Sequence, residues 1–165
     1  VIYRKRALPL AWVVYKGKKG YASAALHVKV LQKVVPLIPE GAKVVLLGDG
    51  EYDETEMVEW VQTETDWKFA LRTSPHINVR QGQIWRRVDT YSKQKGSLVT
   101  VYQVAFTKTA ALSLNLVAWW GVTYEESIYL ITNLPNGSRA CWFYKRRFRI
   151  ETLFSDQKSR GFHIP

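Results

Sequence analysis

The sequence predicts an α/β fold, because short apolar segments with strand character alternate with segments of helical periodicity. Lys43–Gly48 (KVVLLG) is a continuous apolar run, typical of a strand that is buried on both faces. Residues 21–35 precede it, with apolar residues at helical spacing, and Pro36 marks the end of that helix. Trp67–Thr73 (WKFALRT) again has the composition of a strand.

Two further elements complete the first half of the predicted fold. Ala7–Gly17 (ALPLAWVVYKG) is apolar and β-branched, which predicts a strand, and Val1–Arg4 is expected to end a preceding strand paired with it. Asp53 and Glu56 have the spacing of a capping box, so a helix is expected from about residue 54 to residue 62. The predicted order is strand, strand, helix, strand, helix, strand.

The second half of the chain is rich in predicted strands. We interpret 1–73 as the first part of an α/β core, 74–136 as a β-rich insertion subdomain, and 137–165 as a helix that completes the core. The predicted strands of the insertion are 83–91, 98–107, 112–120 and 127–135.

The charge distribution is strongly basic and uneven. The 24 Lys and Arg residues exceed the 14 Asp and Glu residues, which gives a formal net charge of +10. A protein this basic commonly binds nucleic acid, although the charge could serve solubility alone. Eight of the acids lie between Asp49 and Asp66, whereas both ends of the chain are basic. This pattern fits a metal site that acts on phosphates, and it equally fits an ordinary solvated acidic helix.

Several classes of protein are disfavoured by the sequence. Cys141 is the single cysteine, which excludes an internal disulfide framework and a Cys-based zinc site. The sequence has neither an apolar run of about 18 residues nor a signal-peptide pattern at its start, so we expect an intracellular protein without a membrane partner. Because the chain begins without Met inside a predicted strand, we expect it to be a fragment.

The first candidate site residue is Asp49, which follows the predicted strand Lys43–Gly48 and lies between two glycines. Open α/β sheets bind their ligands at the carboxyl ends of strands, and glycines let the backbone turn sharply there. The alternative is an ordinary turn aspartate, because Gly-Asp-Gly is also common loop chemistry.

The second candidate motif lies in the C-terminal helix. At about 100° per residue, four polar side chains fall at about 0°, 300°, 340° and 320° around the axis, on one narrow face. These residues are Tyr144, Arg147, Glu151 and Lys158. The adjacent apolar stripe, expected to pack on a sheet, consists of Phe143, Ile150, Leu153 and Phe154. The alternative is a surface helix in which Arg147 and Glu151 form an incidental i,i+4 pair.

Together the motifs resemble the DDE transposases of bacterial insertion sequences. The residues that carry the resemblance are GDGEYD, the later TNLP and the spacing Tyr144-x2-Arg147-x3-Glu151-x6-Lys158. That spacing is the signature of the insertion-sequence-four family, and the resemblance extends over essentially the whole chain. It implies an RNase H-like catalytic core, here partial and without its first strand, with a β-rich insertion before the C-terminal catalytic helix.

The resemblance also implies a role for each candidate residue. Asp49 would be the second catalytic aspartate and Glu151 the catalytic glutamate, and both would be ligands of a two-metal site for Mg²⁺ or Mn²⁺. Tyr144, Arg147 and Lys158 would hold DNA phosphates. The chemistry agrees, because Mg²⁺ prefers oxygen ligands, Arg can grip a phosphate with two donors and Lys provides a point charge.

The implied function is that of the C-terminal part of a transposase catalytic domain. Such an enzyme cleaves a phosphodiester at the transposon end and transfers the resulting 3′-hydroxyl to target DNA. The implied partners are double-stranded DNA, both transposon ends and target, and a second copy of the chain, which makes a homodimer on DNA. The implied location is the bacterial cytoplasm, associated with the nucleoid through DNA.

Two positions depart from the family pattern. Gly50 stands where the family often has Arg, and no acid precedes Glu40, so the first catalytic aspartate is missing. We therefore expect this chain alone to bind DNA with negligible cleavage. A non-catalytic DNA-binding remnant is the main alternative, and an unrelated RNase H-like nuclease is a third. Trp142 is expected in the core, with stacking on unpaired bases as the alternative use.

Overall fold

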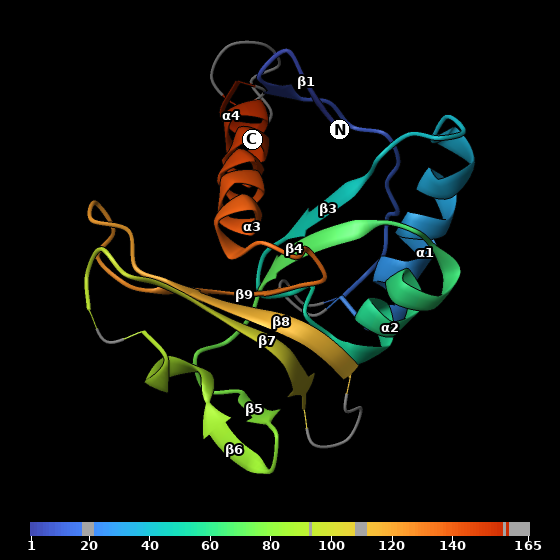
Figure 1. Ribbon diagram of the computed structural model, residues 1–165. Helices are drawn as coiled ribbons and strands as arrows, with labels where there is room; N and C mark the ends of the chain where they lie inside the picture. The colour runs from blue at the N-terminus through green and yellow to red at the C-terminus, as the bar shows by residue number, and fades with distance from the viewer. Residues whose placement is uncertain (18–21, 93, 108–111, 157, 159–165) are drawn as a thin grey trace.

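The protein is built around a mixed β-sheet (Figure 1). The computed structural model describes residues 1–17, 22–92, 94–107, 112–156 and 158. Within these residues, seven strands form one sheet in the order β3-β4-β9-β8-β7-β5-β6, in which β3 and β4 are parallel and the other pairs antiparallel. The strands are β3 (Val45–Gly48), β4 (Lys68–Arg72), β5 (Asn78–Gln81), β6 (Ile84–Arg87), β7 (Leu98–Phe106), β8 (Leu112–Trp119) and β9 (Ile128–Thr132).

Helices cover both faces of the sheet. The helical elements are α1 (Ala24–Val34), α2 (Thr55–Glu64), α3 (Gly137–Tyr144) and α4 (Arg149–Asp156), with 3₁₀ turns η1 (Val35–Leu37), η2 (Val88–Thr90) and η3 (Lys145–Phe148). Figure 1 shows α1 and α2 on one side and α3 on the other. Phe69 and Leu71 of β4 belong to the apolar cluster that includes α2, whereas Ala70 belongs to the cluster that includes α3. Burial on both faces explains the nearly continuous apolar sequence of β4.

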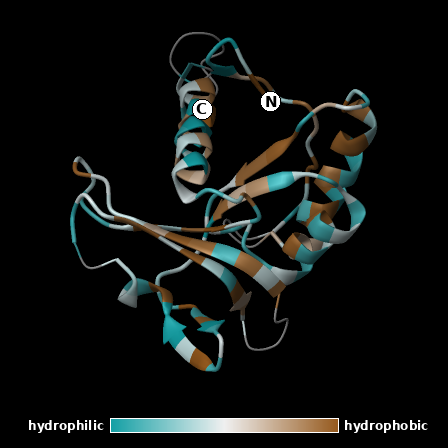
Figure 2. Ribbon diagram, in the orientation of Figure 1, coloured by the Kyte–Doolittle hydropathy of each residue, from teal (hydrophilic) through white to brown (hydrophobic). Residues whose placement is uncertain are grey.

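The α/β prediction is confirmed, and four of the predicted strands correspond to β6, β7, β8 and β9. Strand β5 was not predicted, because Asn78–Gln81 is polar and short. This strand forms a hairpin with β6 through a two-residue turn that begins with Gly82 at φ +59°. Figure 2 shows this hairpin as mainly hydrophilic, unlike the strands that form the core.

The boundary at residue 74 stays a prediction. The strands that follow it join the same sheet as β3 and β4, because β9 pairs with β4 in the register Ala70↔Thr132. One continuous sheet therefore connects the predicted core with the predicted insertion.

The strand expected at Ala7–Gly17 is wrong for most of its length. Only β2 (Arg6–Ala7) is paired, with β1 (Ile2–Tyr3), and residues 8–17 have no regular structure. Trp12 and Val14 are 71% and 89% exposed. A β-branched sequence becomes a strand only where a partner satisfies its backbone groups and covers its side chains, and the described residues provide none.

The open edge of the sheet also explains the burial of β3. This strand was expected to be buried on both faces, but Val45, Leu46 and Leu47 are only partly buried. Among the described residues β3 pairs with β4 alone, which leaves its outer edge without a partner strand.

The predicted capping box does not form. The residue at the N-cap of α2 is Glu54, without a side-chain cap bond, and the helix extends from Thr55 to Glu64. Asp53 accepts a hydrogen bond from Thr73 Oγ1 at 2.6 Å instead. A partner that directly follows β4 has therefore replaced the local cap.

The single C-terminal helix that was expected is divided. Helices α3 and α4 are separated by η3, which has about 3.0 residues per turn where an α-helix has 3.6. The expectation that the apolar stripe packs on the sheet is wrong for α4, because Ile150 and Phe154 are exposed and α4 buries no residue. We call α3, η3 and α4 together the helical column. In Figure 1, α4 forms the end of this column that lies away from the sheet, near β1.

Gly137 at the start of α3 is a sensitive packing position. A Cβ at this site would lie 2.0 Å from Thr100 Oγ1 of β7, so Gly137→Ala should lower the free energy of unfolding by about 1–3 kcal/mol. The matched control is Gly50→Ala, where a Cβ would meet nothing within 4 Å, and a change of less than about 0.5 kcal/mol is expected. Urea unfolding measures both. Equal stability of the two variants would contradict the close approach of α3 to β7.

Candidate active site at the carboxyl end of β3

Asp49 occupies the turn that immediately follows β3. The turn is tight, because Tyr52 N–H donates to the Asp49 carbonyl at 3.0 Å and Glu51 N–H donates to Asp49 Oδ1 at 3.4 Å. A Cβ on Gly48 would lie 2.5 Å from Tyr52 Cβ, so glycine is required where the chain folds back. The Asp49 carboxylate is partly exposed at the end of the strand.

Two contacts anchor this turn to the body of the protein. Tyr52 stacks on the buried His27 of α1, with ring centroids 4.4 Å apart and an interplanar angle of 25°. On the other side, Asp53 is hydrogen-bonded to Thr73 after β4. The position of Asp49 is therefore set by α1 and β4 as well as by β3.

Arg147 connects Asp49 to the C-terminal helical column. Its Nη1 lies 3.5 Å from Asp49 Oδ2, and its Nη2 donates to Glu151 Oε1 at 3.2 Å. The Arg147 side chain is only 17% exposed, whereas both carboxylates are more accessible. One guanidinium thus lies between two acids that are far apart in the sequence.

The two ion pairs limit the separation of the carboxylates. The terminal nitrogens of a planar guanidinium lie about 2.3 Å apart. Together with the two measured distances, this places Asp49 Oδ2 and Glu151 Oε1 within about 9 Å of each other.

Tyr144 ends α3, and its ring centroid lies 5.7 Å from the guanidinium carbon of Arg147. Its residue is 1% exposed, and its ring belongs to the apolar cluster between α3 and the sheet. Burial raises the pKa of the Tyr144 hydroxyl, and the positive charges of Arg147 and Arg72 oppose this shift in its pKa. The Tyr144 ring is therefore part of the hydrophobic core, which leaves only its hydroxyl for a contact with phosphate. The role of Tyr144 in phosphate binding stays a prediction.

The fourth residue of the motif lies apart from the others. Lys158 is exposed and follows α4, about two helical turns beyond Glu151. No ion pair among the described residues links it to Asp49 or Glu151. The structure thus brings together Asp49, Tyr144, Arg147 and Glu151, but not Lys158. The phosphate-binding role of Lys158 stays a prediction.

Two charged residues near this site, Arg72 and Glu126, were not predicted as site residues. Arg72 ends β4, and its Nη2 donates to Glu126 Oε1 at 2.8 Å. The signal for Arg72 was present, because the carboxyl ends of adjacent parallel strands meet at the same edge of a sheet. Glu126 has no comparable signal, since it belongs to a loop distant in the sequence.

Asp49 and Glu151 have the donor chemistry of a divalent-metal site. Carboxylate oxygens are the ligands that Mg²⁺ and Mn²⁺ prefer, and the Arg147 guanidinium already marks a position where positive charge is stabilised between them. In the part of the chain that the structure describes, no three side chains of His, Cys, Asp or Glu are grouped so that they could hold a metal ion. The described residues therefore provide two carboxylate ligands for a divalent metal ion and no third ligand grouped with them.

A mixed α/β sheet with an acid at the carboxyl end of one strand and a second acid on a facing helix defines a class of proteins, the RNase H-like DDE enzymes. A comparison with protein families assigns residues 1–165 to the family described as Transposase DDE domain, and the chain belongs to it. Enzymes of this family act on DNA and use divalent metal ions. The narrower insertion-sequence-four assignment stays a prediction.

A search of curated proteins finds no significant match. In the described parts of the chain, no helix combines the length and the apolar character needed to cross a lipid bilayer.

Asp53 should give the stability of the protein a distinct pH dependence. Burial raises its pKa above the ordinary 3.8, so the folded state binds the proton more tightly than the unfolded state. The contribution of Asp53 to stability is thus present below pH 3.8 and is lost as the pH rises through the folded pKa. Asp53→Asn should remove this loss while it keeps an acceptor for Thr73, and urea unfolding from pH 3 to pH 7 measures the difference.

Asp89 provides a control of opposite sign. Its carboxylate pairs with Arg87, which lowers the pKa of Asp89, so its contribution to stability is present above pH 3.8 and is lost as the pH falls through the folded pKa. Asp89→Asn should therefore lower stability by a constant amount above about pH 3.8 and change its slope with pH only below that value. Parallel stability profiles for wild type and Asp53→Asn above that pH would contradict the assignment to Asp53.

Proposed function

We propose that this chain supplies the C-terminal part of a transposase catalytic domain that cleaves a phosphodiester at the transposon end and joins the 3′-hydroxyl to target DNA. The observation that carries the proposal is the contact of one guanidinium with both Asp49 and Glu151 at the carboxyl end of β3. These acids lie 102 positions apart in the sequence, and an incidental i,i+4 helix pair would not include Asp49.

Asp49 and Glu151 are proposed as ligands of Mg²⁺ or Mn²⁺. Two metal ions about 3.5–4 Å apart, each about 2.1 Å from a carboxylate oxygen, require oxygens separated by no more than about 8 Å. The limit of about 9 Å set by the Arg147 contacts is of this size. When bound, such a pair of ions activates water and stabilises the leaving oxygen of an in-line displacement.

Arg147 is proposed to orient the DNA backbone. Its Nε is buried and lacks a hydrogen-bond partner in the described structure. Arg147 therefore has one unused donor, Nε, in addition to Nη1 and Nη2, which contact Asp49 and Glu151. A guanidinium can present two donors to one phosphate, so a small rotation of the fork would let Arg147 hold a phosphate next to the carboxylates. The hydroxyl of Tyr144 and the ammonium of Lys158 are proposed to hold neighbouring phosphates.

The open edge of β3 supports the proposal that a third carboxylate comes from a strand outside the described sheet. The described residues contain no third acid grouped with Asp49 and Glu151, and β3 has a partner on one side only. On double-stranded DNA, at transposon ends and target, the enzyme is proposed to act as a homodimer, in association with the bacterial nucleoid.

The same observations favour one alternative, a DNA-binding remnant without catalytic activity. Two carboxylates hold a divalent ion less tightly than three, and Arg147 already neutralises part of their charge. Measurements of metal binding and of DNA cleavage distinguish the transposase catalytic domain from the DNA-binding remnant.

Removal of either acid should weaken metal binding. Titration of the protein with Mn²⁺ by calorimetry should show at least about a tenfold weaker affinity for Asp49→Asn and for Glu151→Gln, because each loses a charged ligand. The control is Glu126→Gln, an exposed acid paired with Arg72, which should bind Mn²⁺ like the wild type.

Cleavage by the chain alone should be negligible in Mg²⁺ if a third ligand is missing. Multiple-turnover nicking of transposon-end DNA would contradict the claim that a third metal ligand is absent and would establish a complete active site. Identical Mn²⁺ binding by the wild type and both acid variants would favour the remnant.

Lys158→Ala should reduce the salt dependence of DNA binding. Each phosphate contact releases a counterion, so the slope of log K against log salt should fall by about one when this contact is removed. Fluorescence anisotropy with a labelled duplex at several salt concentrations measures the slope. Lys33→Ala, an exposed lysine on α1, is the control that should leave the slope unchanged. The same slope for Lys158→Ala and wild type would exclude Lys158 from the interface.

A further inference from the structure

The outward side of α3 and the first residues of η3 carry a group of aromatic and basic side chains that the proposed active site does not use. We define the α3 outer face as Arg139 and Trp142 of α3 together with Lys145 and Arg146 of η3. At about 100° per residue, Arg139 and Trp142 lie within about 60° of each other on α3. The buried side of the helix, with Ala140, Cys141 and Tyr144, points the opposite way into the sheet.

Trp142 is the centre of this face. It is 52% exposed, so the expectation that it lies in the core is wrong. The guanidinium carbon of Arg146 lies 3.1 Å from the centroid of the indole ring, and Arg146 Nη1 donates to the Trp142 carbonyl at 2.8 Å. The ring of Phe143 lies nearly perpendicular to the indole, with centroids 4.9 Å apart and an interplanar angle of 80°. The indole is thus held by Arg146 and Phe143, while about half of the Trp142 residue area stays open to solvent.

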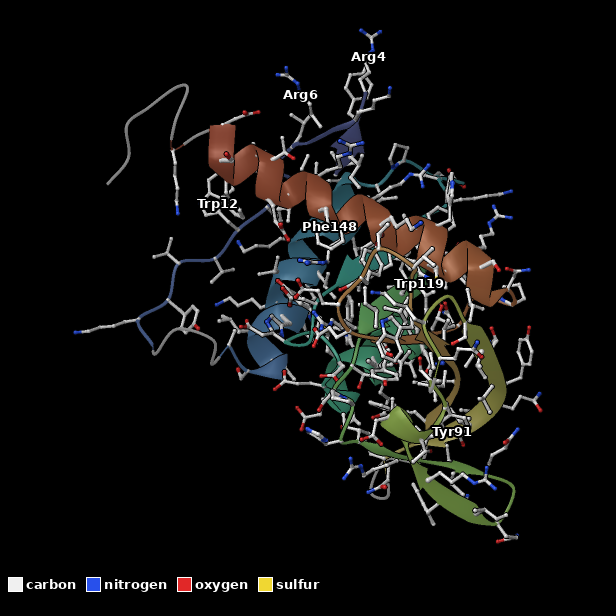
Figure 3. The ribbon with its side chains drawn as sticks, turned by 90° about the vertical axis from the view of Figure 1, so that its left-hand side faces the viewer. Arg4, Arg6, Trp12, Tyr91, Trp119 and Phe148 are labelled. Carbon is white, nitrogen blue, oxygen red and sulfur yellow. The ribbon has the colours of Figure 1, made fainter. Side chains whose placement is uncertain are left out.

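The other two basic residues of the α3 outer face also contact aromatic rings. The guanidinium carbon of Arg139 lies 5.7 Å from the Phe143 ring, and Lys145 Nζ lies 4.9 Å from the ring of Trp119. Trp119 is labelled in Figure 3, beside the helical column. Each of these cations is therefore placed next to an aromatic ring, where the ring attracts the positive charge.

No acid reduces the positive charge of this face. The sequence from Ser127 to Ile150 contains no Asp or Glu. Among the ion pairs of the described residues, none includes Arg139, Lys145 or Arg146. Such a surface attracts polyanions, and desolvating unpaired cations is favourable only when an anion replaces the water.

We propose that the α3 outer face binds a DNA strand with unpaired bases, in which one base stacks on Trp142 and the flanking phosphates contact Arg139, Lys145 and Arg146. An exposed aromatic ring among cations is the arrangement that binds single strands without sequence preference. A duplex hides the faces of its bases, so Trp142 distinguishes single strands from duplex. The inference rests on the proposed function in that DNA is the partner, but the surface is separate from Asp49 and Glu151.

The test compares the affinities of the full chain for a labelled 12-nucleotide oligo-dT and for a labelled duplex of the same length by fluorescence anisotropy. Stacking of one base predicts that Trp142→Ala weakens single-strand binding about 5- to 150-fold. Duplex binding should change less than about threefold. Trp142→Phe should restore most of the single-strand affinity, because Phe also offers a ring face.

Trp12→Ala is the matched control. Trp12 is also an exposed tryptophan, but it belongs to the N-terminal segment shown in Figure 3 and lies outside the α3 outer face. Its replacement should leave single-strand affinity unchanged. If Trp142→Ala does not fold, as judged by circular dichroism, Arg139→Gln replaces it, and a salt slope reduced by about one is the expected result.

The outcomes separate this inference from the proposed function. If the wild type binds duplex and single strands but Trp142→Ala or its replacement binds single strands equally well, the inference is overturned and the proposed function stands. If the wild type binds neither DNA at low salt, the proposed function fails as well. If Trp142→Ala abolishes self-association in sedimentation experiments and leaves DNA affinity intact, the face is a protein interface and the inference is overturned.

Discussion

The ion-pair bridge of Arg147 is the interaction on which the arrangement of the site depends. Without a cation between them, the carboxylates of Asp49 and Glu151 would repel each other across a short distance. Because the Arg147 side chain is largely buried, its charge is screened less by water than an exposed arginine would be. The bridge thereby links the end of β3 to the helical column and compensates two acids at once.

The bridge is possible because α3 is fixed on the sheet. Tyr144, the last residue of α3, is buried in the cluster that contains Ala70 of β4, and this ring sets the position of the helix end. The chain then tightens into η3, and Arg147 lies within that turn. A continuous α-helix would direct Arg147 differently, because 3₁₀ and α geometry diverge by about 20° per residue. The break in the column is therefore part of the site geometry.

The elements that could be predicted from sequence are those whose pattern is determined by neighbouring residues. The helix from Ala24 to Val34 and the strand β4 have apolar spacing that one segment alone defines, and both are confirmed. Residues 8–17 have the same strand composition, but a strand also needs a partner, and that information is not local.

The candidate site shows the same division. Asp49 could be chosen because a glycine-flanked acid after an apolar strand is a local signal. The pairing of Asp53 with Thr73 and the pairing of Arg72 with Glu126 could not be predicted, because both join segments far apart in the sequence. Trp142 was misplaced for a related reason, since apolar composition does not specify which side of a short helix the sheet covers.

The sheet separates an acidic layer formed by α2 from a basic layer formed by α3 and η3, and this separation favours one side for the approach of DNA. The α2 side carries most of the acids between Asp49 and Asp66, whereas the α3 side carries Arg139, Lys145 and Arg146. A polyanion is repelled by the first layer and attracted by the second, so approach from the α3 side is favoured. Asp49 lies at the boundary, because it directly follows a strand of the sheet itself. A DNA backbone held against α3 and η3 would reach the two carboxylates from the basic side, without crossing the acidic layer.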